Sequence, residues 1–333
     1  MKALLSHQPG GPETLRLTDV PDPAPRAGEI VIGVKACGVN YPDVLIIEDR
    51  YQMKPPRPFS PGGEVAGVVA AVGSDVKNFA VGDAVLGLSS HGGMAEKMVV
   101  KAATAGKIPA DTPFAEAAVL LTTYGTSYYA LKDRGQLKPK ERLLVLGASG
   151  GVGIAAVELG KAMGATVIGA VSSPEKAEAV RKAGADHVVV YPTGDLSADQ
   201  QRDLTKAFRD AMGGENADVV YDPVGGAYSE AALRATNWGG RFLVVGFVAG
   251  IPRIPLNLPL LKGCSIVGVL LGGHVGRDPK GYQRNAAEIF AMYQAGTIKP
   301  LISARYPLER GAEAIASLRD RKAVGKVVVT VGE

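Results

Sequence analysis

The sequence has few of the residues that build metal clusters and covalent frameworks. It contains only two cysteines, Cys37 and Cys264, and its four histidines, at positions 7, 91, 187 and 274, include no pair at metal-ligand spacing. Two cysteines exclude a disulfide framework and a four-cysteine zinc lobe. We therefore expect a fold held together by its apolar cores.

An excess of one charge and long apolar runs are also absent. The 37 basic residues against 33 acidic ones leave a net charge of +4, with no run of like charges that would indicate a nucleic-acid or membrane partner. No stretch reaches the roughly 18 apolar residues of a transmembrane helix, and the N-terminus lacks the apolar core of a signal peptide. We expect a complete cytoplasmic protein that acts on small, and in part anionic, molecules.

The sequence is long and apolar enough for about two domains, with 333 residues of which 46% are hydrophobic. Its first part, up to about residue 122, contains short apolar runs broken by Gly and Pro, at 29–39, 64–73, 83–88 and 94–100. This pattern predicts a compact β-rich barrel. Residues 114–131, FAEAAVLLTTYGTSYYAL, are apolar all round and predict a buried helix that leads into the next domain.

The second part alternates apolar strands with amphipathic helices. Strands are predicted at 142–147, 165–171, 186–191, 217–222, 241–247 and 264–272, and helices begin near Gly151, Pro174, Ala198 and Gly226. Strands that are apolar along their whole length are buried on both faces, so we predict a doubly wound parallel sheet. A helix at 282–295 and a strand at 326–332 follow, and this C-terminal piece could return to the first domain.

A glycine-rich loop follows the first strand of this alternating part. RLLVLG runs directly into GASGGVG, residues 147–153, which opens the helix IAAVELGKAMG. A dinucleotide pyrophosphate needs a tight turn, a backbone that it can touch, and free N–H groups at a helix N-terminus. The glycines at 147, 150, 151 and 153 meet these needs, and the surrounding strand and helix distinguish the loop from an ordinary glycine turn. We predict a dinucleotide site here.

The end of the second strand indicates which dinucleotide is bound. Sites that prefer NAD usually place Asp or Glu there, to accept hydrogen bonds from the ribose 2′-hydroxyl. Here the strand ends AVSSPEK, so Ser172 and Ser173 offer hydroxyls, Lys176 offers a positive charge, and Glu175 is expected to point outward. Ser173 before a proline is also typical of a helix N-cap with Lys176 solvated, and the two interpretations are compatible. The expected cofactor is NADPH.

The sequence closely resembles the medium-chain dehydrogenase/reductase superfamily, and within it the zinc-independent, zeta-crystallin-like quinone oxidoreductases. The resemblance is carried by GVNYPDV, PGGEVAGVVAAVG, LLTTYGTSYYAL, LLVLGASGGVGIAAVELGKAMGATVIG and KAGADHVVVY, and it runs over essentially the whole chain. It implies an α/β fold with a GroES-like β-barrel catalytic domain, residues 1–122 and 273–333, and an inserted Rossmann NADP-binding domain, residues 123–272. It also implies a homodimer joined through the sixth Rossmann strand, 264–272.

The resemblance also bears on metal dependence. Metal-dependent relatives place a cysteine ligand where this chain has Asn40, and a histidine ligand where it has Gly63. A third ligand would precede TTYGT, where Ala118 and Val119 offer no donor atom. A catalytic zinc needs about three protein ligands, so the comparison implies a metal-free site.

Matching motifs assign a set of cofactor-binding residues. The resemblance places Asn40 and nearby Asp43 on the nicotinamide side, and Thr126 at the phosphates or the nicotinamide. The resemblance also implies three further groups of contacts. The pyrophosphate would be held by Ser149, Gly150, Gly151, Val152 and Gly153, and the 2′-phosphate end by Ser172, Ser173, Lys176 and Tyr191. The rest of the cleft would be lined by Gly246, Phe247, Val248, Ala249, Val269, Leu270, Leu271 and Lys326. At the last of these the segment AVGKVVV departs from the more polar pattern of the family.

Three residues are candidates for catalysis at the acceptor. Tyr41 or Tyr51 could donate a hydrogen bond or a proton to the reduced oxygen, or could be a core or rim tyrosine whose hydroxyl merely finds a partner. Asp43 could orient its neighbours or serve as a helix N-cap.

Two further features favour structural roles. Cys37 lies in a run of small residues and is typical of a buried apolar cysteine rather than a reactive thiol. His274 and Arg277 could touch an anionic substrate tail, but their place after LLGG favours capping of a turn.

The leading hypothesis is an NADPH-dependent, zinc-independent oxidoreductase that transfers hydride to a quinone-type acceptor. An alternative is an enoyl or other alkene reductase, which would deliver hydride to the β-carbon of an enone or enoyl thioester and then need an acid for the α-carbon. A hypothesis of another class is an NADPH-binding protein without significant turnover.

Overall fold

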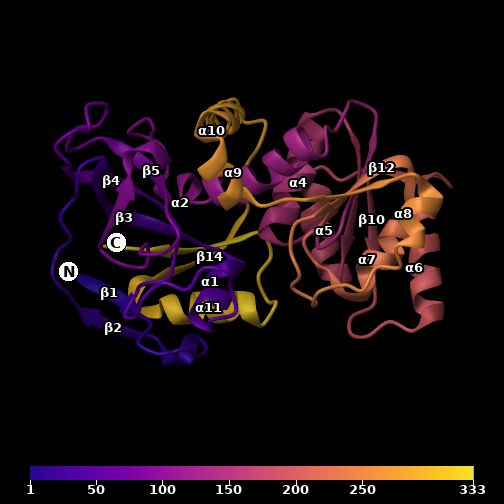
Figure 1. The fold of residues 1–333 in the computed structure, drawn as a ribbon, viewed down its shortest axis with the longest axis horizontal. Coiled ribbons are helices and arrows are strands. Elements are labelled where there is room, and N and C mark those ends of the chain that lie inside the picture. The colour runs from indigo at the N-terminus through magenta and orange to yellow at the C-terminus, as the bar shows by residue number, and fades with distance from the viewer. Residues whose placement is uncertain (333) are drawn as a thin grey trace. The chain divides into compact units, whose positions relative to one another are not determined.

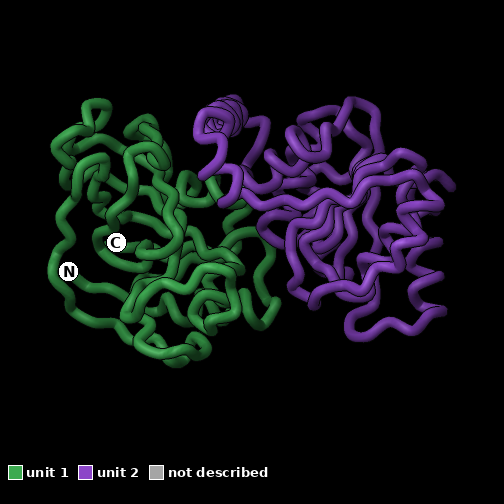
Figure 2. Tube along the Cα trace, in the orientation of Figure 1, with its two compact units in different colours: residues 1–123, 300–333 green, residues 124–299 purple. Residues whose placement is uncertain are grey.

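The computed structural model describes residues 1–332, which divide into two compact units (Figure 2). Unit 1 contains Met1–Thr123 and the C-terminal chain from Pro300, and unit 2 contains Tyr124–Lys299. The first boundary lies within a residue or two of the expected one, whereas residues 273–299, expected in the catalytic domain, are part of unit 2. No helix in the described residues is both long and apolar enough to span a membrane.

Unit 1 is built on a mostly antiparallel sheet, in which β14 and β15 pair in parallel, with a small β1–β2 pair beside it. The strand order is β14-β15-β3-β4-β5-β7, and β6 also pairs with β3. The strands are β1 (Lys2–Leu5), β2 (Arg16–Asp19), β3 (Glu29–Val39), β4 (Glu64–Val72), β5 (Ala84–Leu88), β6 (Lys97–Lys101), β7 (Ala105–Lys107), β14 (Ile302–Pro307) and β15 (Lys326–Thr330), and the helices are α1 (Tyr41–Ile47), α2 (Phe114–Ala117) and α11 (Gly311–Arg319). The short turns η1 (Pro12–Thr14), η2 (Ala102–Thr104) and η5 (Leu308–Arg310) complete it.

The core of unit 1 forms where strands from both ends of the chain meet. β15 pairs with β3, with Val327 opposite Val39, so the C-terminal strand extends the N-terminal sheet. Ile30, Ile32 and Val329 are fully buried between the sheet and its helices. The return of the C-terminal strand to the first domain is therefore confirmed, and it places Lys326 beside the end of β3.

Unit 2 is a six-stranded parallel sheet of order β10-β9-β8-β11-β12-β13. Helices lie around this sheet (Figure 1). Its strands are β8 (Arg142–Val145), β9 (Thr166–Val171), β10 (His187–Val190), β11 (Ala217–Asp222), β12 (Thr236–Val244) and β13 (Ser265–Gly268), and its helices are α3 (Gly125–Tyr128), α4 (Gly151–Ala162), α5 (Pro174–Lys182), α6 (Ala198–Ala211), α7 (Gly226–Arg234), α8 (Asn257–Lys262), α9 (Leu271–Arg277) and α10 (Pro279–Gln294). This order is that of the doubly wound dinucleotide-binding fold. The predicted fold class is confirmed.

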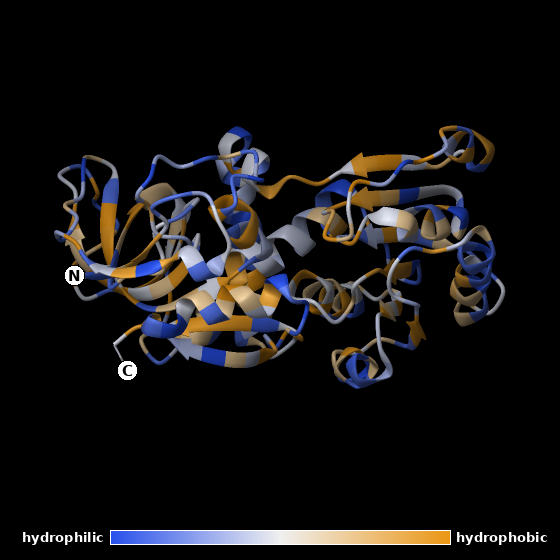
Figure 3. Cartoon of the chain, turned by 90° about the horizontal axis from the view of Figure 1, so that it is seen from below, coloured by the Kyte–Doolittle hydropathy of each residue, from blue (hydrophilic) through white to orange (hydrophobic). Residues whose placement is uncertain are grey.

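The apolar strands explain this topology. Leu143, Leu144 and Val145 are all fully buried, as strands covered on both faces require, and many strands appear as hydrophobic ribbons in Figure 3. Helices such as α6 instead bury one stripe, through Leu204 and Phe208, and expose the other face. Because its strands are apolar on both faces, the sheet is stable only when helices cover both of those faces.

Residues 114–131 do not form one regular helix. They divide into α2, η3 (Leu120–Tyr124), α3 and η4 (Tyr129–Arg134), and η3 and η4 are π-helical. Their apolar pattern identified a buried helical segment correctly, but it does not encode the wider turns, which occur often at functional sites. The sixth strand is also shorter than expected, because the chain enters α9 at Leu271.

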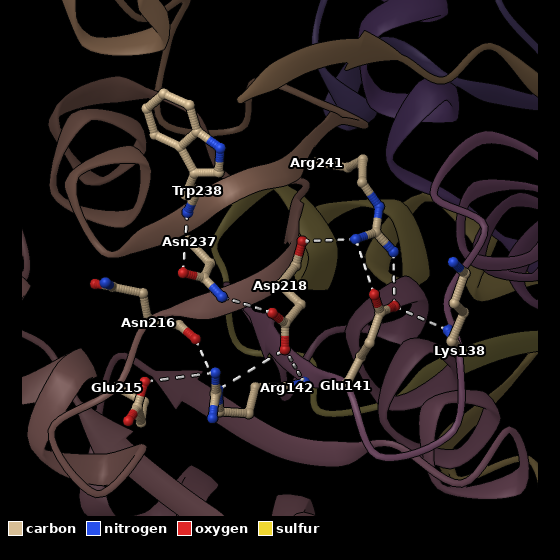
Figure 4. A network of polar contacts seen from close by, with 9 residues as sticks. All are labelled: Lys138, Glu141, Arg142, Glu215, Asn216, Asp218, Asn237, Trp238 and Arg241. Carbon is tan, nitrogen blue, oxygen red and sulfur yellow. Dashed lines mark hydrogen bonds and ion pairs between the residues drawn. The ribbon is translucent and has the colours of Figure 1, made fainter. Parts of the chain in front are cut away.

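The amino-terminal edge of the parallel sheet is closed by a polar network (Figure 4). Arg241 donates two hydrogen bonds to the Glu141 carboxylate, at 3.0 and 2.6 Å. Asp218 accepts from the backbone N–H of Arg142 at 2.8 Å and from the amide of Asn237 at 2.9 Å. These contacts join the chain before β8 to β11 and β12. They leave the opposite, carboxyl edge to the loops that carry the predicted cofactor residues.

Candidate active site

The carboxyl ends of the parallel strands gather most of the predicted cofactor residues of unit 2. Each predicted segment follows the end of a strand: 149–153 after β8, 172–176 after β9, 191 after β10, 246–249 after β12 and 269–271 after β13. Because parallel strands end at one edge of the sheet, these segments line a common edge. This edge is where doubly wound sheets bind their ligands.

The glycine-rich loop has the geometry that a pyrophosphate requires. Gly147 turns the chain with φ +57°, and the N–H of Gly150 donates to the carbonyl of Gly147 at 3.0 Å. Gly150 is the N-cap of α4, so the N–H groups that follow lack helical acceptors. A Cβ on Gly153 would lie 2.2 Å from the Gly147 carbonyl oxygen, which explains why only glycine fits there. The loop is thus a preformed cradle for an anion.

Two buried hydroxyl groups form a hydrogen-bonded chain to the first turn of α4, which follows this loop. Ser127 on α3 donates to the carbonyl oxygen of Val152 at 2.8 Å, and its oxygen lies 2.9 Å from the Tyr221 hydroxyl on β11. Burial raises the pKa of Tyr221, so its hydroxyl stays protonated and able to donate. Sequence inspection did not identify this support, because neither residue lies in a glycine-rich or charged motif.

The end of β9 brings together the residues predicted for the 2′-phosphate. Ser173 is the N-cap of α5 and Pro174 its first residue, as the sequence predicts. The Lys176 ammonium donates to the Ser172 hydroxyl at 3.1 Å, so the hydroxyl and the positive charge lie side by side. Glu175 is exposed. No carboxylate follows β9 directly, and the segment fits an anionic group.

The remaining predicted residues of unit 2 differ in exposure. Tyr191 is buried, with its ring 4.8 Å from that of Tyr228. Val269 is buried, whereas Phe247 and Leu270 are 45% and 58% exposed, so the loops after β12 and β13 present apolar surface. Thr126 lies half-buried on α3, one residue before Ser127.

His274 and Arg277 lie in α9 rather than in a turn. The imidazole of His274 stacks on the ring of Tyr129, with centroids 4.3 Å apart, and Arg277 donates weakly to the carbonyl of Gly273 at 3.5 Å. Their contacts are within unit 2 and fit the structural role.

In unit 1, Asn40 and Asp43 begin helix α1 as a capping box. Asn40 is the N-cap. The Asp43 carboxylate accepts from the backbone N–H of Asn40 at 2.8 Å and from the backbone N–H of Gly62 at 3.0 Å. Asp43 is therefore not the N-cap that its position after Tyr-Pro suggested, but the third helical residue that reaches back to it. Burial raises its pKa to about 6, while the two N–H donors and Lys326 oppose that rise.

A buried charged pair flanks the Asn40 side chain. The Lys326 ammonium donates to the Asn40 Oδ1 at 2.6 Å and to the Val39 carbonyl at 2.9 Å, and it lies 3.9 Å from the Glu64 carboxylate. Glu64 accepts from the Asn40 Nδ2 at 3.1 Å and from the N–H of Thr122 at 2.8 Å. Burial raises the pKa of Glu64 and lowers that of Lys326, and each charge opposes the shift of the other. Glu64 was missed because a charge at the start of a strand is usually exposed.

The two candidate tyrosines are partly buried against the apolar core of unit 1. Tyr41 is the first residue of α1 and is half-buried, and Tyr51 follows that helix and packs partly on the core of unit 1. Burial, with a smaller contribution from the Asp43 carboxylate, raises the pKa of Tyr51, which keeps its hydroxyl protonated. Cys37 is fully buried and unreactive in character, since burial raises its thiol pKa well above the usual value.

The described residues contain no group of three or more His, Cys, Asp or Glu placed to hold a metal ion. At the positions that carry ligands in metal-dependent relatives, Ala118 and Val119 are fully buried and apolar. The nearest cation to Asn40 is instead the Lys326 ammonium.

Comparison with known proteins agrees with this architecture. Residues 26–110 match the family described as the alcohol dehydrogenase GroES-like domain, and residues 151–289 match the family described as zinc-binding dehydrogenase. The chain is 37% identical over 305 residues to a quinone oxidoreductase-like protein 2 homolog of Nematostella vectensis, covering 90% of this chain and 81% of that protein.

Solved structures give the same result over nearly the whole chain. The Escherichia coli quinone oxidoreductase complexed with NADPH matches with a TM-score of 0.89 and 30% identity, covering 99% of this chain and 100% of that one. The CurK enoyl reductase matches with a TM-score of 0.87 and 27% identity, covering 99% of both chains. The predicted family is therefore confirmed, and the chain belongs to the medium-chain dehydrogenase/reductase superfamily, in its quinone oxidoreductase-like branch.

Proposed function

We propose that this protein is an NADPH-dependent oxidoreductase that reduces a quinone-type acceptor. The observation that carries the proposal is the carboxyl edge of the unit 2 sheet, where a preformed anion cradle and the Ser172–Lys176 pair lie on neighbouring strands. The similarity to a quinone oxidoreductase-like protein 2 homolog and to a quinone oxidoreductase solved with NADPH supports it.

The residues of this edge fit the parts of the cofactor. The first turn of α4 offers backbone N–H groups to the pyrophosphate, while Lys176 and Ser172 offer a charge and a hydroxyl to the 2′-phosphate. NADPH supplies a hydride when bound. On the acceptor side, Tyr51 is one candidate donor of a hydrogen bond or a proton to the reduced oxygen, since its hydroxyl is protonated near neutral pH. Tyr41 is the second candidate.

We also propose that hydride transfer in this protein needs no zinc. The positions of the expected ligands carry an amide and small or apolar side chains, and an ammonium already supplies positive charge to Asn40. Elemental analysis of the purified protein tests this proposal, and stoichiometric zinc would contradict it. A cytoplasmic location is likewise proposed, in keeping with two cysteines that form no disulfide.

The direct test follows NADPH consumption against quinones, enones and enoyl thioesters. Turnover of quinones is expected. Efficient reduction of a thioester with idle quinones would favour the alkene reductase, a second candidate suggested by the likeness to the CurK enoyl reductase. Tight NADPH binding with no turnover of any acceptor would favour a binding protein.

Cofactor choice gives a prediction for Lys176. We expect Lys176→Ala to raise the KM for NADPH about 10- to 100-fold, since a charge-assisted contact with the 2′-phosphate is lost, and to leave kcat nearly unchanged. The KM for NADH should not change. Lys182→Ala, at the other end of α5, is the matched control and should behave as wild type. A wild-type protein that uses NADH and NADPH equally would contradict the 2′-phosphate assignment.

We further propose that the protein forms a homodimer through β13. This strand is at the edge of the sheet, and its Ser265, Ile266 and Gly268 are exposed. Apolar side chains on the preceding segments are also exposed: Trp238, which lies against Gly263, and Leu256, Leu260 and Leu261. An exposed apolar edge strand tends to pair with another chain. In a dimer with two-fold symmetry, the β13 strands of the two copies would pair with each other and satisfy the free backbone N–H and C=O groups of both.

The dimer proposal predicts a position-dependent effect of charge. Ile266→Lys should shift the protein from dimer to monomer in sedimentation velocity, because it places a charge in the paired edge. Val190→Lys is the matched control, since Val190 is 46% exposed on β10 at the other edge of the same sheet, close to the 41% of Ile266. A wild-type monomer, or equal effects of the two changes, would contradict the proposal.

A further inference from the structure

The Asn40 side chain is held between two charged residues from the neighbouring strands. Asn40 follows the end of β3, and the flanking strands β15 and β4 begin with Lys326 and Glu64. Both charged side chains are almost fully buried, at 5% and 1% exposure. The sheet order β15-β3-β4 therefore places an ammonium on one side of the amide and a carboxylate on the other.

These partners leave the amide only one orientation. Its Nδ2 donates to the Gly38 carbonyl at 3.2 Å and to Glu64 at 3.1 Å, and its Oδ1 accepts from Lys326 at 2.6 Å and from the Thr123 hydroxyl at 3.4 Å. A flipped amide would direct its N–H groups at an ammonium and its oxygen at a carboxylate. All hydrogen-bonding groups of the side chain are thus matched in one state and opposed in the other.

Stability alone does not explain this arrangement. Removing two charges from water costs free energy that their attraction barely offsets, and apolar residues of similar size often replace a buried ion pair without loss. The surrounding unit 1 core is apolar and could accommodate such a replacement. The pair is explained if the position of Asn40 matters for function.

We propose that Glu64 and Lys326 are positioning residues that together fix the orientation and place of the Asn40 amide. This inference rests on the proposed function and on the expectation from the family resemblance that Asn40 faces the nicotinamide side of the cofactor. Glu64 also binds the backbone N–H of Thr122, and Thr123 contacts Asn40, so the same network fixes the chain where it leaves unit 1.

The test compares Glu64→Gln, Lys326→Met and the double variant in the full-length protein. Each single variant leaves a buried charge without its partner and should lower Tm by roughly 5 °C or more, whereas the double variant has no unpaired charge and should regain most of that loss. In the double variant kcat should still be about 10- to 100-fold below wild type, because the two charges no longer fix the orientation of the amide. Its NADPH Kd should stay within about threefold, since unit 2 holds the phosphates.

A readout independent of turnover is the emission of bound NADPH, which reports the surroundings of the nicotinamide. It should differ from wild type in the double variant but not in Lys107→Met, which removes a surface ion pair with Asp83 in the same unit. A double variant with restored Tm and wild-type kcat and emission would overturn the inference alone. A wild-type protein that binds no NADPH would overturn the proposed function as well.

Discussion

Gly153→Ala is expected to lower the affinity for NADPH more than about 100-fold and to lower the free energy of unfolding by about 3 kcal/mol. A Cβ at this position lies 2.2 Å from the Gly147 carbonyl oxygen and 2.8 Å from the backbone of Ala148. These are backbone atoms of the loop itself, so they cannot move aside as a flexible side chain would. Either the turn opens or α4 shifts, and both displace the N–H groups that form the anion cradle.

A second glycine of the same helix separates loop damage from general instability. A Cβ on Gly160 would meet the side chains of Leu143 and Val167, at 2.6 and 3.0 Å, deep under the sheet and away from the loop. Gly160→Ala should therefore lower the free energy of unfolding with little change in the NADPH Kd. Chemical denaturation and fluorescence titration of both variants provide the comparison, and wild-type NADPH affinity in Gly153→Ala would contradict the role assigned to the loop.

The sequence predicts this part of the molecule well, because short-range patterns encode it. The strands of unit 2 are continuous apolar runs, and a strand, a glycine-rich turn and a helix follow one another without interruption at 142–162. The N-cap at Ser173 also follows from local chemistry, since serine before proline suits the start of a helix. Each of these features depends on residues a few positions apart.

Features that depend on distant contacts were not predicted. Residues 273–299 belong to unit 2 because α10 joins α3 and η4 through Asn285, which donates to Asp133 at 2.6 Å, and Glu288, which pairs with Lys132. These partners are separated by more than 150 positions in the chain, and no local pattern marks them. The assignment of the C-terminal helix to the catalytic domain therefore did not match the observed division.

The same limit applies to the Asn40 cluster. The sequence singled out Asn40, as the residue in place of a cysteine ligand, and Lys326, as a tentative cleft residue. It could not show that Glu64 joins them, because β15 reaches β3 only in the folded unit. Asp43 was recognised as a possible cap residue, but its second partner, the N–H of Gly62, comes from the loop before β4.

The buried Asp43 carboxyl should make the stability of unit 1 fall as pH rises through about 6. Burial raises its folded pKa to about 6 from the ordinary 3.8 of an aspartate, so the folded state binds the proton more tightly than the unfolded chain does. For an acid with a raised pKa, this contribution is complete below the unfolded pKa and is lost as pH rises through the folded one. The difference corresponds to about 3 kcal/mol.

Asp43→Asn isolates this contribution. The Asn amide would direct its NH2 group at one of the two backbone N–H groups that Asp43 binds, whereas the hydroxyl oxygen of the protonated Asp43 carboxyl can still accept, so the variant should be less stable than wild type at pH about 4 by some 1–3 kcal/mol. Between pH about 4 and 7 that deficit should shrink or reverse, because wild type alone must ionise a buried carboxyl. The other charged groups around it, Glu64 and Lys326, are present in both proteins.

Asp83 provides a control with the opposite sign. It lies at the surface of unit 1, and hydrogen bonds from Lys107 and from the N–H of Ala80 lower its pKa. Its contribution is therefore present above the unfolded pKa and lost as pH falls through the lower, folded pKa, so Asp83→Asn should cost more at pH 7 than at pH about 2. Urea unfolding of the three proteins across this range measures both slopes. Parallel curves for wild type and Asp43→Asn would show that the Asp43 carboxyl titrates as it does in water.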